Sequence, residues 1–276
     1  MDPLKLMAVL AHPDDESMGC GGTLARAAAE GVQTYLVTAT HGQGGRYRGI
    51  GQGEPGHPGP ERLAGIRETE LRAAALALGI REVRMLGYVD QQLDRADPAE
   101  VVGRIAAEIR RVRPHVIMTF DPQGGYGHPD HIAISQFAGA AIVAAADPAH
   151  ASGGAPPHAV SKFYYFAWTR RLEEVYQAAF RRMVSLVDGV ERSSVPWPDW
   201  SITTVIDTRD YWRTVWKAVS CHESQVTAYE KLKDVPPDHH EAMWGWQYFY
   251  RVFSTVNGGR TRETDLFEGL RGKVSA

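Results

Sequence analysis

The stretch LKLMAVLAHPDDE, residues 4–16, decides the fold class expected for this 276-residue chain. Residues 4–11 form a nearly continuous apolar run, which is typical of a strand buried on both faces of a parallel sheet. The run ends at His12-Pro13, and a helical pattern follows over residues 21–30, closed by Gly31. A buried strand that leads into a helix is the repeating unit of an α/β fold.

The same alternation continues to about residue 147. It predicts strands over 34–40, 83–86 and 116–120 and helices over 61–78, 98–112 and 131–146, with Asp97 capping the helix that begins at Pro98. Right-handed crossovers then give an α/β, Rossmann-like doubly wound, mostly parallel sheet. Ligands bind such sheets at the carboxyl ends of the strands, where the strand order reverses. In the usual order that point lies between strands 4–11 and 116–120, and a His-Pro motif follows each of them.

The second half of the chain has a weaker pattern. Residues 148–157 are rich in Pro, Gly and small residues, which is typical of a surface loop or linker. Beyond it the pattern predicts strands over 162–168 and 203–206 and helices over 170–185 and 211–231. We therefore expect a single domain over 1–276, with a Rossmann-like core at 1–147 and a smaller C-terminal α+β extension at 158–276 packed on its sheet.

Composition argues against several classes of protein. The net charge is −3, which does not fit the clustered basic surface of a nucleic-acid-binding protein. No apolar run approaches the roughly 20 residues that span a bilayer, and the N-terminus does not read as a signal peptide. Cys20 and Cys221 form no CxxC pair and read as buried free thiols, which suits a reducing compartment. We expect a soluble, cytoplasmic protein without a nucleic-acid or membrane partner.

The box AHPDDE, residues 11–16, contains the first group of candidate metal ligands. A catalytic zinc site needs three His, Asp or Glu ligands and an open position for water. His12 and Asp15 are three residues apart and can converge on one ion from a tight turn that Pro13 restricts. Asp14 then remains beside the metal as a candidate general base. The alternative is that these acidic residues only favour the start of a helix through its dipole.

The box GGYGHPDH, residues 124–131, follows the fourth predicted strand and contains a third candidate ligand, His131. Pro129 fits the first position of a helix, whose N-terminus keeps a nearby histidine neutral and able to bind a metal. Asp130 is placed to orient one of the imidazole ligands. Two such clusters at the ends of neighbouring parallel strands favour a metal site over two helix caps.

With both boxes intact, the chain resembles the PIG-L/LmbE-like N-deacetylases. The resemblance covers roughly the first 145 residues and continues weakly at Cys221-His222-Glu223-Ser224-Gln225. It implies a metal-dependent hydrolase with three ligands, His12, Asp15 and His131. The implied ion is zinc, with ferrous iron as the alternative. Some members of this family are oligomers, so a homo-oligomer is possible.

The resemblance also implies roles for residues around the metal. Asp14 would be the general base that takes a proton from water. His128 would stabilise the oxyanion or protonate the leaving amine, and Tyr126 matches a tyrosine that helps the oxyanion. The sequence of the second box is similar to that of the family branch that acts on GlcNAc-inositol. In that branch, the positions that Arg67 and Asp90 match contact the sugar.

Local interpretations of some residues stay open beside these roles. Arg67 can instead pair with Glu70 on an exposed helix face, and Asp90 can be a turn residue. The Gly-rich loop over 42–60 is either a lid that sets substrate specificity or a flexible solvent loop.

The leading hypothesis is a zinc-dependent hydrolase that removes the N-acetyl group from a small N-acetylated amino sugar containing GlcNAc. A second hypothesis is an amidase that cleaves thiol conjugates of a GlcNAc-inositol compound. A third is a non-catalytic ligand-binding protein on the same fold. The presence of Asp14 and His128 argues against the third hypothesis, because a structural metal site needs neither of them.

Overall fold

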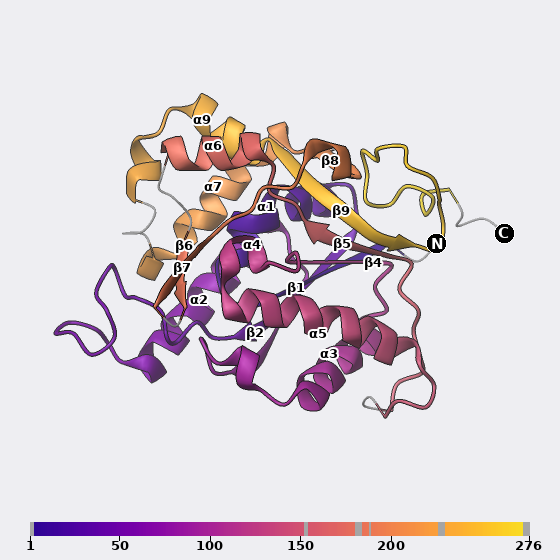
Figure 1. Ribbon diagram of the computed structural model, residues 1–276, viewed down its shortest axis with the longest axis horizontal. Helices are drawn as coiled ribbons and strands as arrows, with labels where there is room; N and C mark the ends of the chain where they lie inside the picture. Colours follow the sequence, from indigo (N-terminus) through magenta and orange to yellow (C-terminus); the bar gives the residue numbers. More distant parts are fainter. Residues whose placement is uncertain (1–2, 152–153, 180–183, 188, 226–229, 273–276) are drawn as a thin grey trace.

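The computed structural model describes residues 3–151, 154–179, 184–187, 189–225 and 230–272 (Figure 1). Within these residues one seven-stranded sheet has the strand order β3-β2-β1-β4-β5-β9-β8. Its strands are β1 (Lys5–Leu10), β2 (Gln33–Thr40), β3 (Glu82–Tyr88), β4 (Val116–Thr119), β5 (Lys162–Phe166), β8 (Thr204–Asp207) and β9 (Trp246–Ser254). Strands β1 to β5 pair in parallel, whereas β9 is antiparallel to both β5 and β8. A separate hairpin joins β6 (Val184–Val187) to β7 (Val190–Ser193).

Helices cover both faces of this sheet. They are α1 (Asp15–Ala29), α2 (Pro60–Leu78), α3 (Pro98–Val112), α4 (Gly124–Gly127), α5 (Pro129–Ala146), α6 (Arg170–Ala179), α7 (Trp212–Cys221) and α9 (Pro237–Trp244). Helix α3 packs on α5, while α7 packs on both α1 and α2 (Figure 1). Short 3-10 turns occur at Leu93–Arg95, Asp199–Ser201, Arg209–Tyr211, Glu223–Gln225 and Glu230–Asp234. No helix among the described residues is both long and apolar enough to cross a bilayer.

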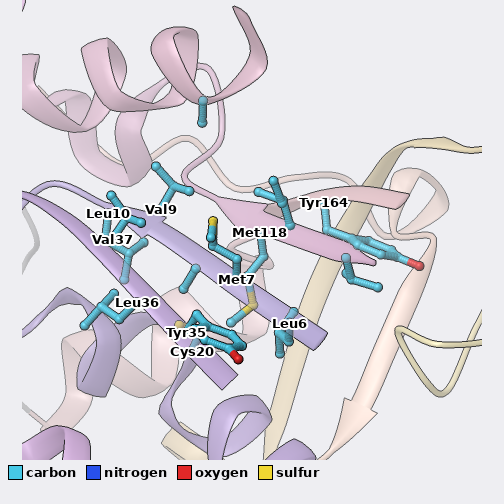
Figure 2. Packing of buried hydrophobic residues seen from close by; sticks show 14 of the residues in the cluster. Leu6, Met7, Val9, Leu10, Cys20, Tyr35, Leu36, Val37, Met118 and Tyr164 are labelled. Carbon is cyan, nitrogen blue, oxygen red and sulfur yellow. The ribbon is translucent and has the colours of Figure 1, made fainter. Parts of the chain in front are cut away.

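The core lies along β1, as the opening stretch of the sequence predicts. Every side chain from Leu6 to Ala11 is fully buried, because helices cover both sides of the strand. Figure 2 shows Leu6, Met7, Val9 and Leu10 of β1 among Leu36 and Val37 of β2 and Met118 of β4. The predicted doubly wound α/β fold and the adjacency of the first and fourth strands are confirmed.

The first helix begins earlier than its prediction at Gly21. Helix α1 starts at Asp15, where the acidic Asp15 and Glu16 interact favourably with the helix dipole. The helix then bends at Cys20, whose φ and ψ are −146° and 16°. One glycine of this helix allows close packing. A Cβ on Gly22 would lie 2.7 Å from the Cβ of Thr208, so α1 approaches the C-terminal half closely.

Two predictions for the C-terminal half are wrong, and one strand was missed. Strand β9 was not predicted, although it joins β5 to β8 and makes the C-terminal half part of the same sheet. The helix expected over 170–185 ends at Ala179, and β6 begins at Val184. The helix expected over 211–231 ends at Cys221, while residues 180–183 and 226–229 lie outside the described part of the chain. Apolar and aromatic residues in these segments fit helical and strand periods alike, so partners distant in sequence decide between them.

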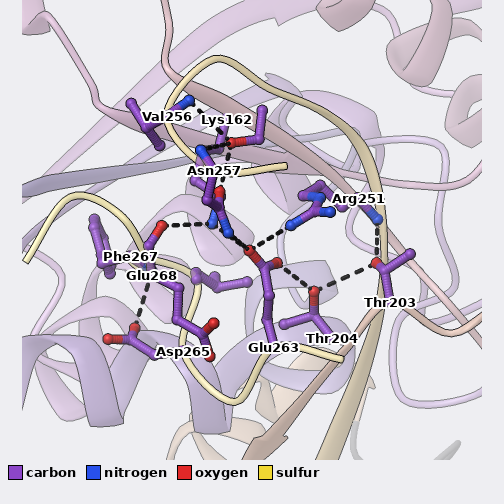
Figure 3. A network of polar contacts seen from close by, with 12 residues as sticks. Lys162, Thr203, Thr204, Arg251, Val256, Asn257, Glu263, Asp265, Phe267 and Glu268 are labelled. Atoms are coloured by element: carbon purple, nitrogen blue, oxygen red, sulfur yellow. Dashed lines mark hydrogen bonds and ion pairs between the residues drawn. The ribbon is translucent and has the colours of Figure 1, made fainter. Parts of the chain in front are cut away.

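A buried polar network attaches the C-terminal segment to the sheet (Figure 3). Its centre is Glu263, which is 1% exposed. The carboxylate accepts hydrogen bonds from Lys162 Nζ at 2.6 Å, Arg251 Nη1 at 2.7 Å and Tyr164 Oη at 2.7 Å. Burial alone would raise the pKa of Glu263, but its hydrogen bonds outweigh burial and lower the pKa to about 2. Glu263 is therefore a stabilising anion above the pH range in which it titrates.

Replacing Glu263 by glutamine should lower the free energy of unfolding by about 3–5 kcal/mol, because fully buried Lys162 would lose its counter-charge. The pKa of Glu263 is depressed on folding. Its stabilisation is thus complete above its unfolded pKa and is lost as the pH falls toward about 2. Urea unfolding at neutral and acid pH measures both effects. Asp207→Asn, in an exposed pair with Arg209, is the control and should change stability by less than about 1 kcal/mol. Equal unfolding midpoints for Glu263→Gln and the wild type would contradict this role.

Candidate active site

The candidate site lies at the carboxyl ends of β1 and β4, which are parallel neighbours in the middle of the sheet. The chain leaves β1 toward β2 on one side and leaves β4 toward β5 on the other, so the strand order reverses here. A cavity of about 220 Å³ opens at this point. The residues that line it are His12, Asp14, Asp15, Met18, Gly19, Gly45, Arg67, Asp90, Gln91, Phe120, Gly125, Tyr126, His128, His131, Phe166, Trp168, Tyr176 and Gln225.

Three expected metal ligands converge at the floor of this cavity. His12 Nδ1 lies 3.1 Å from His131 Nε2, and Asp15 Oδ1 lies 3.4 Å from the same nitrogen. Donors bound to a tetrahedral zinc at 2.0–2.2 Å stand roughly 3.3–3.6 Å apart, so these two spacings are close to those around one ion. The third spacing is longer, since the nearest oxygen of Asp15 to His12 Nδ1 is Oδ2 at 3.8 Å. The other oxygen, Asp15 Oδ2, accepts hydrogen bonds from the backbone N–H groups of Ala11 and His12 at 3.1 and 2.7 Å. These bonds hold the carboxylate so that Oδ1 faces His131 Nε2.

Two combinations of three donors have ligand atoms within 4.8 Å of one another among the described residues, and neither contains Asp15. One combines His12 and His131 with His128, and the other combines His12 with Asp90 and Asp130. In the second combination the carboxylates approach the opposite ring nitrogen, His12 Nε2, at 3.0 and 3.1 Å. Carboxylates in this position orient a histidine ligand in metal sites. This sets the second combination aside. We propose His12, Asp15 and His131 as the ligands, with His128 in place of Asp15 as the alternative.

Asp130 and Asp90 both lie behind His12. Asp130 is fully buried and also accepts from the backbone N–H groups of Gln91 at 2.7 Å and Leu93 at 3.0 Å. This placement supports the orienting role expected for Asp130. Asp90 was expected to contact a sugar, yet its oxygens already face His12 Nε2 and the N–H of Gly44. Burial raises the pKa of Asp90, but the hydrogen bond and charge of His12, the charge of Arg67 and the Gly44 N–H together outweigh burial and lower it to about 2.

Asp14 lies at the cavity wall in an unusual backbone conformation. Its φ of 105° and ψ of −24° fall in a region that residues other than glycine rarely adopt. Two contacts hold it there. Its N–H donates to Glu16 Oε2 at 2.9 Å, and its carboxylate pairs with Arg67 Nη2 at 3.2 Å. Burial raises the pKa of Asp14 while Arg67 opposes the rise, which moves this carboxyl group toward the range of a general base.

Arg67 is buried, and not exposed as the local interpretation of its helix suggested. Besides Asp14, its guanidinium donates to the carbonyl oxygens of Pro13 and Gly42, so it ties the first box to the Gly-rich loop. Glu70 does not pair with it and instead accepts from the N–H and Oγ of Ser224, both at 2.6 Å. Since Arg67 still lines the cavity, contact with a substrate stays a prediction.

His128 and Tyr126 stand on the other side of the candidate ligands. The N–H of Asp130 donates to His128 Nδ1 at 3.2 Å, so neutral His128 carries its proton on Nε2. Burial, together with His12 and His131, lowers the pKa of His128 to about 3, which keeps the ring neutral near pH 7. The Tyr126 ring meets His131 edge-on at 5.3 Å between centroids. Both side chains are placed to face a substrate held over the ligands.

If His128 acts as a neutral donor, His128→Gln should keep more activity than His128→Ala. The glutamine side chain also presents an N–H group near the position of Nε2, whereas alanine removes the donor. We expect kcat to fall by about 10²–10³-fold in His128→Ala, the usual cost of losing one oxyanion donor, and by clearly less in His128→Gln. Steady-state kinetics at constant metal content measures this. Equal losses in both variants would show that His128 acts otherwise.

Sequence reasoning did not assign two buried residues next to Asp14. His222 Nε2 lies 2.8 Å from Glu16 Oε1, and both side chains are fully buried. Glu16 in turn accepts the Asp14 N–H, so the C-terminal half of the chain reaches the candidate base through this pair. The only sequence feature that pointed to His222 was the weak family resemblance around Cys221–Gln225.

The Gly-rich loop reaches the rim of the cavity, as one of its two interpretations requires. Gly45 lines the cavity, and the neighbouring Gly44 donates its N–H to Asp90. From the C-terminal half, Gln225 Nε2 donates to the carbonyl of Arg46 at 2.9 Å, and Gln225 also lines the cavity. Two distant segments therefore meet at the entrance, which favours a role of the loop in substrate selection.

Comparison with known proteins decides the family. Residues 7–142 match PIG-L, the GlcNAc-PI de-N-acetylase family. A relative from Kineococcus radiotolerans is the 1D-myo-inositol 2-acetamido-2-deoxy-alpha-D-glucopyranoside deacetylase. It is 35% identical to this chain, over 97% of this chain and 83% of the relative. The chain belongs to the PIG-L family. This membership confirms the prediction of an N-deacetylase, a hydrolase that cleaves an amide.

Solved structures show how widely this PIG-L fold is used. N,N'-diacetylchitobiose deacetylase from Pyrococcus horikoshii matches with a TM-score of 0.67 and 21% identity, over 91% of this chain and 84% of that one. The 4-carboxy-2-hydroxymuconate hydratase of Pseudomonas putida matches with a TM-score of 0.65 and 20% identity, over 93% and 99%. Because a hydratase shares the fold, the fold alone does not identify the reaction.

Proposed function

We propose that this PIG-L protein removes the acetyl group from GlcNAc-inositol or a closely related small GlcNAc glycoside, with zinc as its ion. One observation carries the proposal. A single cavity joins the donors His12, Asp15 and His131 to a buried carboxyl group, Asp14, and a neutral imidazole, His128. The activity named for the Kineococcus relative, which is similar over 97% of this chain, supports the choice of substrate.

Each residue of the site has a separate role in the hydrolysis. A zinc ion held by His12, Asp15 and His131 would polarise the amide carbonyl and acidify water. Asp14 takes the proton of the attacking water as the new C–O bond forms. His128 Nε2–H and the Tyr126 hydroxyl donate to the carbonyl oxygen as it becomes negative. Asp14 then returns the proton to the nitrogen as the C–N bond breaks, which yields acetate and a free amine.

The substrate test is an amine-release screen over GlcNAc, N,N'-diacetylchitobiose, GlcNAc-inositol and a thiol conjugate of the GlcN-inositol scaffold. Each is assayed with and without a chelator. We expect GlcNAc-inositol to give the highest kcat/KM and the chelator to abolish its hydrolysis. Faster cleavage of the thiol conjugate would overturn the proposal in favour of the amidase. Zinc or ferrous iron is then added back to the chelator-treated enzyme, and the ion that restores its activity is identified. A cytoplasmic location and a homo-oligomeric state remain predictions.

A further inference from the structure

Asp14, the candidate base, has a backbone conformation that the rest of the site has to maintain. It is the N-cap residue of α1, and its carbonyl oxygen accepts from the N–H groups of Ser17 and Met18 at 3.1 and 3.0 Å. An aspartate at an N-cap usually turns its carboxylate onto the first helical N–H groups. The Asp14 carboxylate makes no such bond and lies at the cavity wall beside Arg67. Because φ is 105°, this arrangement costs free energy and persists only where neighbouring groups restrain it.

Glu16 restrains the backbone of Asp14. Its Oε2 accepts the Asp14 N–H at 2.9 Å, much as the acidic residue of a capping box reaches back to the N-cap. Its Oε1 accepts from Ser17 Oγ at 2.5 Å and lies 2.8 Å from His222 Nε2. Glu16 is fully buried, so its carboxylate depends on these partners in place of water.

His222 is the partner of Glu16 that comes from outside α1. It directly follows α7 and is fully buried. Since a carboxylate oxygen only accepts, His222 Nε2 donates to Glu16. Ser17 is the chain neighbour of Glu16 and moves with it, whereas His222 is held by the packing of α7 on α1. His222 therefore fixes the Glu16 carboxylate relative to the rest of the protein.

We propose that His222 is a positioning residue for the hydrolysis, acting through Glu16 on the backbone of Asp14. It keeps the Asp14 carboxylate directed at the attacking water, while Arg67 restrains the same carboxylate from the other side. The inference rests on the proposed function, in which Asp14 is the base. A displaced base slows proton transfer, so the loss of His222 should appear in kcat.

The metal ligands depend on different bonds. Asp15 Oδ2 is held by the backbone N–H groups of Ala11 and His12, and neither bond involves Glu16 or His222. Loss of the His222 hydrogen bond should therefore leave the metal content unchanged. This separates a positioning role from a general disturbance of the metal site.

The test replaces His222 by asparagine and by glutamine. Glutamine places an amide N–H near the position of Nε2 and can still donate to Glu16, whereas the shorter asparagine cannot reach it. His222→Asn should lower kcat by about 10–100-fold, the usual result of displacing a catalytic group by about 1 Å, with KM within about threefold of the wild type. His222→Gln should keep kcat within about fivefold. Amine-release kinetics and elemental analysis on the same preparations measure both, and each variant should bind as much metal as the wild type.

His240→Asn is the matched control for the same change at another buried histidine. His240 also lies in the C-terminal half, and its Nε2 bonds the carbonyl of Leu232 at 2.7 Å, but it does not line the cavity. We expect His240→Asn to keep the wild-type kcat. An equal loss of kcat in His240→Asn and His222→Asn would overturn the positioning role, because both losses would then reflect weakened packing.

Combining His222→Asn with Asp14→Asn shows whether His222 acts through Asp14. If it does, the double variant should have the kcat of Asp14→Asn alone within about threefold, since the effects of coupled residues do not add. A further loss of about tenfold or more would overturn the positioning role, because His222 would then act by another route. Wild-type kcat in His222→Asn, or equal losses in His222→Asn and His222→Gln, would also overturn it. Failure of the wild type to release amine from every GlcNAc substrate would contradict the proposed function itself, whereas these other results contradict only the role of His222.

Discussion

Replacing Asp14 by asparagine should lower kcat by about 10²–10⁴-fold while the protein still binds one metal ion per chain. This is the usual contribution of a positioned general base. The carboxylate lies at the cavity wall and is not one of the three proposed ligands, so its loss should spare the metal. Asparagine is the informative replacement because it tolerates a positive φ better than other residues without a carboxylate, and φ here is 105°.

The measurement pairs steady-state kinetics with elemental analysis on the same preparation. Asp94→Asn serves as a control, since Asp94 is exposed and does not line the cavity. If Asp14→Asn turns over substrate at the wild-type rate, Asp14 is not the base. If the variant instead loses its metal, Asp14 belongs to the ligand set, and the division of roles between Asp14 and Asp15 has to be reversed.

Replacing His131 by alanine should remove nearly all bound metal and nearly all activity. The ring nitrogen of His131 lies 3.1 Å from His12 Nδ1 and 3.4 Å from Asp15 Oδ1, so it is central to the proposed set. A metal that binds only the folded chain also raises its unfolding temperature. Added zinc should therefore raise the unfolding temperature of the wild type but not that of His131→Ala.

This variant also separates the ligand sets that contain His131 from the set His12, Asp90 and Asp130. If His12, Asp90 and Asp130 held the ion, His131→Ala would keep its full metal content, which would contradict our assignment. Removing His131 also leaves a gap against Phe120, so a second variant, His131→Gln, retains more of the volume and should lose metal as well. His239→Ala is the control for general effects of removing a histidine, because His239 is exposed.

The pairing of Glu16 with His222 shows how the C-terminal half contributes to the site. Strand β9 and helix α7 could be regarded as only completing the core, yet the end of α7 places His222 on the residue that holds the Asp14 N–H. The loop over 42–60 is tied to the same segment through Gln225. The site is therefore built from both halves of the chain. This agrees with the similarity to the Kineococcus relative, which extends over 97% of this chain.

Residues 4–16 and 124–131 by themselves determined the fold class, the place of the site and its candidate ligands. They did so because buried strands and His-Pro boxes are local patterns, and parallel topology brings the ends of strands together. Only the tertiary structure decided which other residues surround the candidate ligands. The burial of Arg67, the position of Asp90 behind His12 and the contact of His222 with Glu16 join segments that are far apart in sequence. Strand β9 likewise pairs with β5 and β8 only in the folded chain. Such contacts depend on which distant surfaces meet, and neither hydrophobic periodicity nor motif spacing contains that information.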